Sequence, residues 1–371
     1  MLLVHGKVFM GDCFDETLQV RVENSVISEI GNLAPRRGEP VTDLNGDYLL
    51  PGFVDVHIHA SQGVDTMQGE EAVRAMSRFL YTQGVAAFCP TTMSANEADT
   101  HAALQGIRAV MAQPEKEGAH VLGAHMEAPF LQEKKAGAQL KEFFADPDWA
   151  YMERVTDGES GLVRLITLAA ERNGAEAFIR QAVKNGIRVS VGHTDADAET
   201  VHQAGDWGAD HVTHTFNAQT PIHHRKPGVP GAVLTDDRFY CEAICDGVHL
   251  HRDIVRLIAR CKGNHAVAIT DAMEAAGLPD GEYGLGGQKV LVHGAEARLE
   301  DGTLAGSVLT MPKALENLIH RFDIDPIQAC AMCTRNPANS IGETKAGRIV
   351  PGAPAPLTRW SGDWKMVEVI V

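Results

Sequence analysis

The stretch that decides the fold is Phe53-Val54-Asp55-Val56-His57-Ile58-His59, an apolar β-type run that ends in His-x-His. Residues two apart on a strand point to the same face, so His57 and His59 can converge on one cation only from a strand or an extended edge. Taken alone, the pair fits equally well two polar residues at a loop boundary. The rest of the chain decides between these interpretations.

Seven more short apolar runs follow, separated by longer helical stretches. The eight predicted strands cover residues 53–59, 86–90, 121–127, 162–169, 187–192, 211–214, 240–245 and 266–271. Between them, apolar residues recur near helical spacing, as in segments 70–83, 97–111, 175–185 and 252–260. Eight strands that alternate with helices favour an α/β fold with a closed (β/α)8 TIM barrel over an open doubly wound sheet.

The two ends of the chain have a different pattern. Short alternating stretches separated by turn residues cover 2–4, 18–22 and 26–30, and strand-like pieces return at 347–350 and 367–371. We therefore expect both termini, residues 1–50 and 345–371, to combine into a small β-sandwich domain. The barrel would then comprise residues 51–344.

Composition limits the function classes. The 371 residues are 44% hydrophobic, enough for a large core, and carry a net charge of −16 without a basic stripe. A nucleic-acid or anionic-membrane surface is therefore not expected. The N-terminus lacks a basic and apolar leader pattern, and no window approaches 18 uninterrupted apolar residues, so we expect a cytoplasmic protein. Seven cysteines scattered in apolar contexts predict reduced thiols, including the Cys330 and Cys333 pair on a predicted helix.

Polar residues gather where the predicted strands end. In a barrel these carboxyl ends form one rim, which is where catalytic groups lie. The residues concerned are His57, His59, Glu127, His193, His214, Asp246, His249 and Asp271. Nitrogen and oxygen ligands without thiolate are typical of catalytic zinc, or of another divalent metal such as iron. Because a metal lowers the pKa of bound water toward neutrality, hydrolysis is the natural reaction class.

Asp271 follows the apolar run 266–270 and would point into the mouth of the barrel. A carboxylate there can accept a proton from water and pass it to a leaving group. The alternative is a helix N-cap before Ala272.

A set of motifs in a fixed order gives the chain a resemblance to a known family. The motifs are 51–59 (PGFVDVHIH), 123–130 (GAHMEAPF), 191–194 (VGHT), 214–218 (HTFNA), 225–228 (RKPG), 246–249 (DGVH), 270–272 (TDA) and 304–311 (LAGSVLTM). Together they resemble the N-acetylglucosamine-6-phosphate deacetylases of the amidohydrolase superfamily, through nearly the whole chain.

The resemblance implies roles for individual residues. Glu127, His193 and His214 would bind the principal metal, and Asp271 would be the acid/base. Members that keep His-x-His, as this chain does at His57 and His59, can hold a second metal, whereas others work with one. The expected cofactor is thus a divalent metal, zinc or iron, with one or two ions per chain.

The resemblance also implies contacts to a small amino-sugar phosphate and a homodimer in which Arg225 and His249 reach a neighbour's substrate. The substrate-binding residues would be Ala138, Gln139, Asn217, Ala218, Arg225, His249, Leu304, Ala305 and Gly306. Backbone N–H groups and a guanidinium can hold a phosphate even in an acidic protein. On the residues alone, Arg225 fits equally well a solvated basic loop with His223, His224 and Lys226.

Two positions depart from the family pattern. Many members have a histidine at the position of Gln139, where it helps to polarise the amide carbonyl; a neutral amide can donate a hydrogen bond but cannot become cationic. Gln219 stands where a methionine is common. It lies near the expected phosphate contacts, and either a changed sugar preference or a neutral loop substitution fits.

The expected activity is hydrolysis of N-acetylglucosamine 6-phosphate to glucosamine 6-phosphate and acetate in amino-sugar recycling. The motifs fix the reaction better than the stereochemistry of one hydroxyl, so N-acetylgalactosamine 6-phosphate or another N-acyl substrate is the alternative. A catalytically silent sugar-phosphate sensor is the rival from another class, and the presence of all the metal-ligand candidates and Asp271 argues against it.

Overall fold

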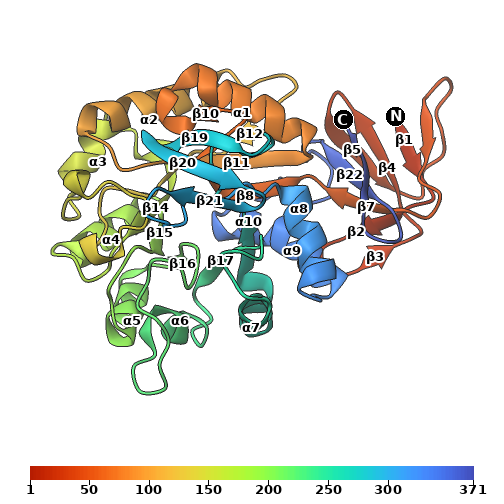
Figure 1. The fold of residues 1–371 in the computed structure, drawn as a ribbon. Helices are drawn as coiled ribbons and strands as arrows, with labels where there is room; N and C mark the ends of the chain where they lie inside the picture. The colour runs from red at the N-terminus through yellow and green to blue at the C-terminus, as the bar shows by residue number, and fades with distance from the viewer.

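A computed structural model describes all of residues 1–371, and its centre is a parallel barrel (Figure 1). Its eight strands lie in chain order around the barrel and are joined by seven parallel pairings. Between the eighth strand and the first, Asp271 N donates to His57 O at 2.9 Å and His59 N to Ala272 O at 3.1 Å. The strands are β8 (Phe53–Ile58), β11 (Val85–Thr92), β13 (Ala124–Met126), β14 (Val163–Leu168), β15 (Arg188–Val191), β16 (His211–Val212), β17 (Tyr240–Ile244) and β18 (Ala266–Ile269). The predicted (β/α)8 barrel is confirmed.

Helices follow the strands and cover the outside of the barrel, burying their apolar faces in one continuous core (Figure 1). Several begin at a side chain that accepts a backbone N–H, such as Asn96 before α2 and Asp197 before α5. The helices are α1 (Glu70–Thr82), α2 (Glu97–Ala112), α3 (Trp149–Val155), α4 (Ala175–Lys184), α5 (Ala198–Trp207), α6 (Gly228–Val233), α7 (Arg252–Lys262), α8 (Met311–Glu316), α9 (Pro326–Cys333) and α10 (Arg335–Ser340). Short turns of other helix types are η1 (Thr66–Gln68), η2 (Glu133–Lys135), η3 (Lys141–Phe143), η4 (Ser160–Leu162), η5 (Gly263–His265) and η6 (Asn317–Arg321).

The two chain ends meet beside the barrel in two small sheets, of order β5-β4-β1-β6 and β23-β22-β7-β2-β3 (Figure 1). Apolar residues from both termini, such as Leu3, Leu49 and Leu357, share one buried cluster. The expected β-sandwich from both termini is therefore present, while its exact limits at residues 50 and 345 stay a prediction. Its strands are β1 (Leu2–Val4), β2 (Lys7–Phe9), β3 (Phe14–Asp15), β4 (Gln19–Glu23), β5 (Val26–Gly31), β6 (Val41–Asp43), β7 (Tyr48–Pro51), β22 (Leu357–Trp360) and β23 (Met366–Ile370).

The strand predicted at 347–350 is wrong. These residues form turns instead, since Gly347 has a positive φ of 71° and Pro351 has no N–H to donate to a ladder. Ile349 still packs into the core of the terminal sheets, which explains the apolar pattern.

A three-stranded antiparallel sheet after β18 was not predicted. It comprises β19 (Gly281–Leu285), β20 (Gln288–His293) and β21 (Glu296–Leu299), and it lies across the barrel in Figure 1. Gly286 and Gly287, both with positive φ, form the tight turn between β19 and β20. This glycine pair was the signal in the sequence. Three further short strands are β9 (Ala60–Ser61), β10 (Val64–Asp65) and β12 (His120–Val121).

Two smaller expectations are also tested. All seven cysteines are free, and Cys330 and Cys333 are buried on α9. No helix combines the length and the apolar character needed to span a membrane.

Candidate metal centre

Three polar residues at the rim of the barrel have a strained backbone. His193 and His214 follow β15 and β16, and Asp271 follows β18; their φ angles are 44°, 30° and 47°. A non-glycine residue in this left-handed region costs free energy, and such residues concentrate at functional sites. With this left-handed backbone, the three side chains face the barrel mouth.

Glu127, His193 and His214 form the tightest group of ligand atoms. Oε1 of Glu127 lies 3.1 Å from Nε2 of His193 and 3.1 Å from Nε2 of His214, and the two nitrogens are 3.0 Å apart. All three residues are buried. These separations suit three ligands around one divalent ion.

His57 and His59 lie beside this group. Their Nε2 atoms are 3.3 Å apart, and Nε2 of His59 lies 3.2 Å from Oε2 of Glu127. Both histidines are buried, His57 within β8 and His59 directly after it, so the strand interpretation of the motif is confirmed. Glu127 can therefore bridge the two groups of histidines, each of which it completes.

Hydrogen bonds on the far side of the rings fix the tautomers. Nδ1 of His193 lies 2.8 Å from the Lys135 carbonyl, Nδ1 of His59 lies 3.3 Å from the Thr91 carbonyl, and Nδ1 of His57 lies 3.0 Å from Glu242. Each acceptor requires the proton on Nδ1, so in the neutral rings the lone pairs of the three Nε2 atoms face the same space. Converging lone pairs repel one another unless a cation lies between them. The donor set thus fits a divalent metal.

Charge in this buried space is mutually compensated. Burial by itself would raise the pKa of Glu127, but His57 and His193 hold it well below its ordinary value. Burial would lower the pKa of His57, yet the surrounding carboxylates, Asp271 first, raise it to about 9. The pKa of Asp271 is lowered, because His57 and His59 outweigh burial.

Asp271 points at the metal ligands. Its Oδ1 lies 3.3 Å from Nε2 of His59 and 3.5 Å from Nε2 of His57. No helix begins at Ala272, so the N-cap alternative is wrong. The backbone N–H of Asp271 instead closes the barrel onto His57.

A cavity of about 340 Å³ opens above these residues. It brings together seven of the nine expected substrate-binding residues: Ala138, Gln139, Asn217, Ala218, His249, Leu304 and Gly306. Ala305 is buried beside the cavity without lining it. Leu285 of β19 also lines it, so the unpredicted sheet contributes to its wall.

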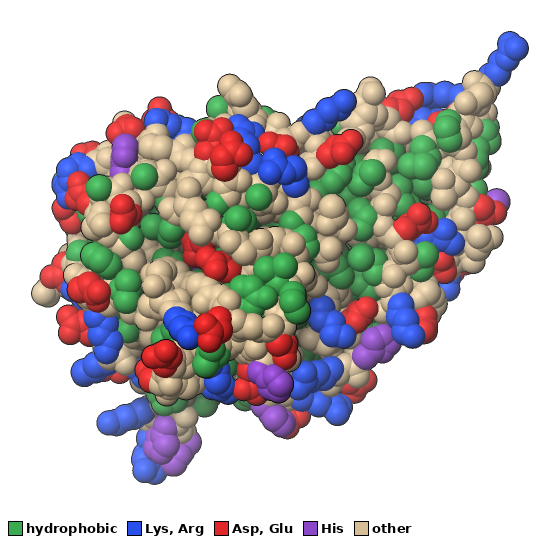
Figure 2. Space-filling view, turned by 45° about the horizontal axis from the view of Figure 1, so that its top comes forward, with side chains coloured by type: hydrophobic (Ala, Val, Ile, Leu, Met, Phe, Trp, Pro, Cys, Tyr) green, Lys and Arg blue, Asp and Glu red, His purple; other side chains and the backbone are tan.

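Arg225 does not line the cavity of its own chain. It lies exposed between β16 and α6, on a loop that projects from the lower edge of the molecule in Figure 1. Histidine and basic side chains gather on a projection at the same corner in Figure 2.

Sequence reasoning missed several residues of the site. Lys134 and Lys135 line the cavity, and Nζ of Lys135 donates to the Gln219 carbonyl at 3.0 Å. Their position in the loop before Gln139 was the available signal. Glu242, below the metal ligands, was also missed, although a carboxylate in the apolar run Tyr240–Ile244 is conspicuous.

Comparison with known proteins agrees with this arrangement. Residues 48–371 match the family described as the Amidohydrolase family. The chain belongs to this family. The finding confirms the superfamily that the motifs indicated.

Curated relatives of this amidohydrolase carry related names. This chain is 37% identical over 327 residues to N-acetylglucosamine-6-phosphate deacetylase of Bacillus subtilis, and the aligned region covers 87% of this chain and 83% of the relative. It is also 35% identical over 336 residues to N-acetylgalactosamine-6-phosphate deacetylase of Escherichia coli, where the aligned region covers 90% of this chain and 88% of the relative.

Solved structures of similar amidohydrolases share the whole fold. N-acetylglucosamine-6-phosphate deacetylase from Pasteurella multocida superposes with a TM-score of 0.93 at 28% identity, covering 100% of this chain and 97% of the other. An aspartate-to-alanine mutant of the Mycobacterium smegmatis enzyme, in complex with N-acetyl-D-glucosamine-6-phosphate, has a TM-score of 0.91 at 31% identity with the same coverage.

Proposed function

We propose that this amidohydrolase hydrolyses N-acetylglucosamine 6-phosphate to glucosamine 6-phosphate and acetate. The observation that carries the proposal is the convergence of Glu127, His193, His214 and Asp271 at the floor of one cavity. The names of the relatives supply the substrate, since N-acetylglucosamine-6-phosphate deacetylases match this chain over most of its length.

The residues divide the chemistry between them. A divalent metal, zinc or iron, held by Glu127, His193 and His214 would lower the pKa of water and polarise the acetyl carbonyl. Asp271 accepts the proton of the attacking water and delivers it to the departing amine. Its Oδ1 lies 3.3 Å from Nε2 of His59, which places the carboxylate beside the metal ligands. His57 and His59 offer a second metal position with Glu127.

The phosphate belongs at the polar rim of the cavity. His249, whose Nδ1 lies 2.7 Å from Oδ2 of Asp246, turns its other ring nitrogen away from that carboxylate. Asn217 and Ala218 line the same wall. Arg225 projects away from its own cavity, and we propose that it serves the substrate of a second copy in a homodimer.

The proposed compartment is the cytoplasm. Seven free cysteines, of which Cys13 and Cys261 are exposed, fit a reducing environment.

Acetate release from the two epimeric sugar phosphates, measured in parallel, tests the proposal. We expect a higher kcat/KM on the gluco substrate. Asp271→Asn should lower kcat about 10²–10⁴-fold and keep both metal and fold, because only proton transfer is lost. A higher kcat/KM on N-acetylgalactosamine 6-phosphate would reassign the substrate, and no acetate from either sugar would refute the activity.

A further inference from the structure

Glu242 is a carboxylate inside the barrel, and the proposed chemistry does not use it. It lies on β17 below the metal ligands and is fully buried. A buried carboxylate is costly unless hydrogen bonds and opposite charges compensate it. Its contacts therefore indicate what it is there to hold.

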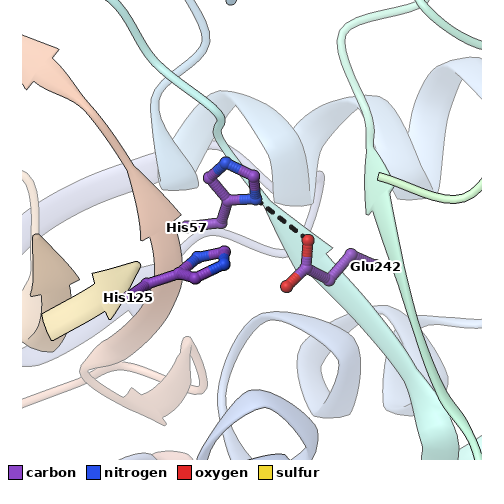
Figure 3. Close-up of side chains that lie close together, drawn as sticks. All are labelled: His57, His125 and Glu242. Carbon is purple, nitrogen blue, oxygen red and sulfur yellow. Dashed lines mark hydrogen bonds and ion pairs between the residues drawn. The ribbon is translucent and has the colours of Figure 1, made fainter. Parts of the chain in front are cut away.

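Both oxygens of Glu242 face histidines. Oε2 accepts from Nδ1 of His57 at 3.0 Å, a contact drawn in Figure 3, and from the backbone N–H of His214 at 3.1 Å. Oε1 lies 3.2 Å from Nε2 of His211, which is also fully buried, but the two atoms form no hydrogen bond. One carboxylate oxygen thus connects a residue of the His-x-His pair to a ligand of the principal group.

The two contacts act on different properties. The bond to Nδ1 keeps a proton on that nitrogen of His57, and it leaves Nε2 facing His59 and Glu127. The bond to the His214 N–H stabilises the backbone of His214, whose φ of 30° is a left-handed conformation that few non-glycine residues adopt. The main-chain oxygen of Glu242 also accepts from Thr215 N at 2.9 Å, so β17 secures this turn at two points.

His57, His125 and Glu242 also lie close enough together to suggest a separate, deeper metal site. His57 is instead committed to the upper group, because its Nδ1 donates to Glu242 while its Nε2 faces His59 and Glu127. Nε2 of His125 is bonded to Thr167 Oγ1 at 2.8 Å, and its Nδ1 has no partner. Figure 3 shows His125 beside the other two without an interaction to either.

We propose that Glu242 is a positioning residue of the metal centre, which orients His57 and holds the strained backbone of His214. The proposal rests on the proposed function, because it assumes that these histidines bind metal. Outer hydrogen-bond partners of metal ligands commonly contribute 10–100-fold to metal affinity.

The test compares the zinc affinity of Glu242→Gln and Ser190→Ala with the wild type by chelator competition. Ser190 is a matched control, because it is fully buried in the same barrel interior and bonds Thr213, not a metal ligand. We expect Glu242→Gln to weaken zinc binding roughly 10–100-fold and Ser190→Ala to leave it unchanged. The melting temperature of the metal-free proteins checks folding.

A second variant covers the case in which Glu242→Gln does not fold. Glu242→Asp keeps the buried charge but withdraws it by one methylene, so it cannot hold both His57 and His214, and it should also weaken zinc binding. In a His57→Gln background, the effect of Glu242→Gln should become smaller. Zinc affinity of the folded Glu242 variants equal to that of Ser190→Ala would overturn the proposal. A wild type that binds no metal would instead refute the metal centre itself.

Discussion

Gln139 donates a hydrogen bond from its side-chain amide to Oε2 of Glu127 across 2.5 Å. Its other end is fixed as well, since Oε1 accepts from the Ser94 N–H at 2.7 Å. The amide is therefore locked beside the carboxylate that both groups of histidines share. A neutral donor at this position supports a metal ligand directly.

Replacing Gln139 with Ala should lower kcat/KM about 10–100-fold, because a hydrogen bond to a charged group contributes about 1.5–3 kcal/mol. The same variant should bind metal less tightly, measured by chelator competition. If metal affinity is retained while kcat/KM falls, Gln139 acts on the substrate carbonyl instead of on Glu127.

His193→Ala should remove the essential metal and the activity while leaving the fold intact. The ring nitrogen lies 3.1 Å from Glu127 and 3.0 Å from the nitrogen of His214, so its loss opens the ligand set. Elemental analysis and circular dichroism measure the two effects. His202→Ala, on the outer helix α5, is the control and should keep both metal and activity. A fully metallated, active His193 variant would rule out the assignment.

The double variant His57→Gln, His59→Asn should keep one metal per chain and measurable activity. The principal group retains Glu127, His193 and His214, which need neither residue of the pair. Metal content per chain and acetate release are the measurements. Loss of all metal would show that the pair belongs to the primary site.

Arg225→Ala should raise KM for the phosphorylated sugar, with a loss of kcat/KM on the order of 10–100-fold, and affect unphosphorylated N-acetylglucosamine little. Unphosphorylated N-acetylglucosamine has no phosphate for the guanidinium to bind. Lys226→Ala, on the same exposed loop, is the matched control. Equal losses on both substrates would indicate a structural or interface role for Arg225.

The terminal sheets should lose stability in acid through Glu39. Hydrogen bonds from Arg21 lower the pKa of Glu39 from 4.5 to about 2. Because the folded pKa is the lower one, the stabilisation is complete above about pH 4.5 and is lost as the pH falls through about 2. Thermal melts of the wild type and Glu39→Gln across this range should converge at the acid end. A constant difference between them would refute the linkage.

Much of the site followed from local pattern. The His-x-His run, the alternation of strands with helices and the polar residues after each strand all predict a barrel rim, because a strand's period and its carboxyl end are local properties. The three-stranded sheet 281–299 was missed, although its glycine pair is local, since it lies outside the barrel repeat. The strand predicted at 347–350 is absent for a different reason: its apolar residues pack into the core of the terminal sheets, but their backbone pairs with no strand.

The sequence by itself determined the barrel, the kinds of ligand available and the order in which they occur along the chain. Only the tertiary structure decided that one oxygen of Glu127 lies within 3.1 Å of both His193 and His214. It also decided that Arg225 lies outside the cavity of its own chain and that Glu242 bonds to His57. Residues 57 and 242 belong to the first and seventh strands, so their contact depends on closure of the barrel. Closure is a property of the whole sheet, and no local pattern specifies which side chains it brings face to face.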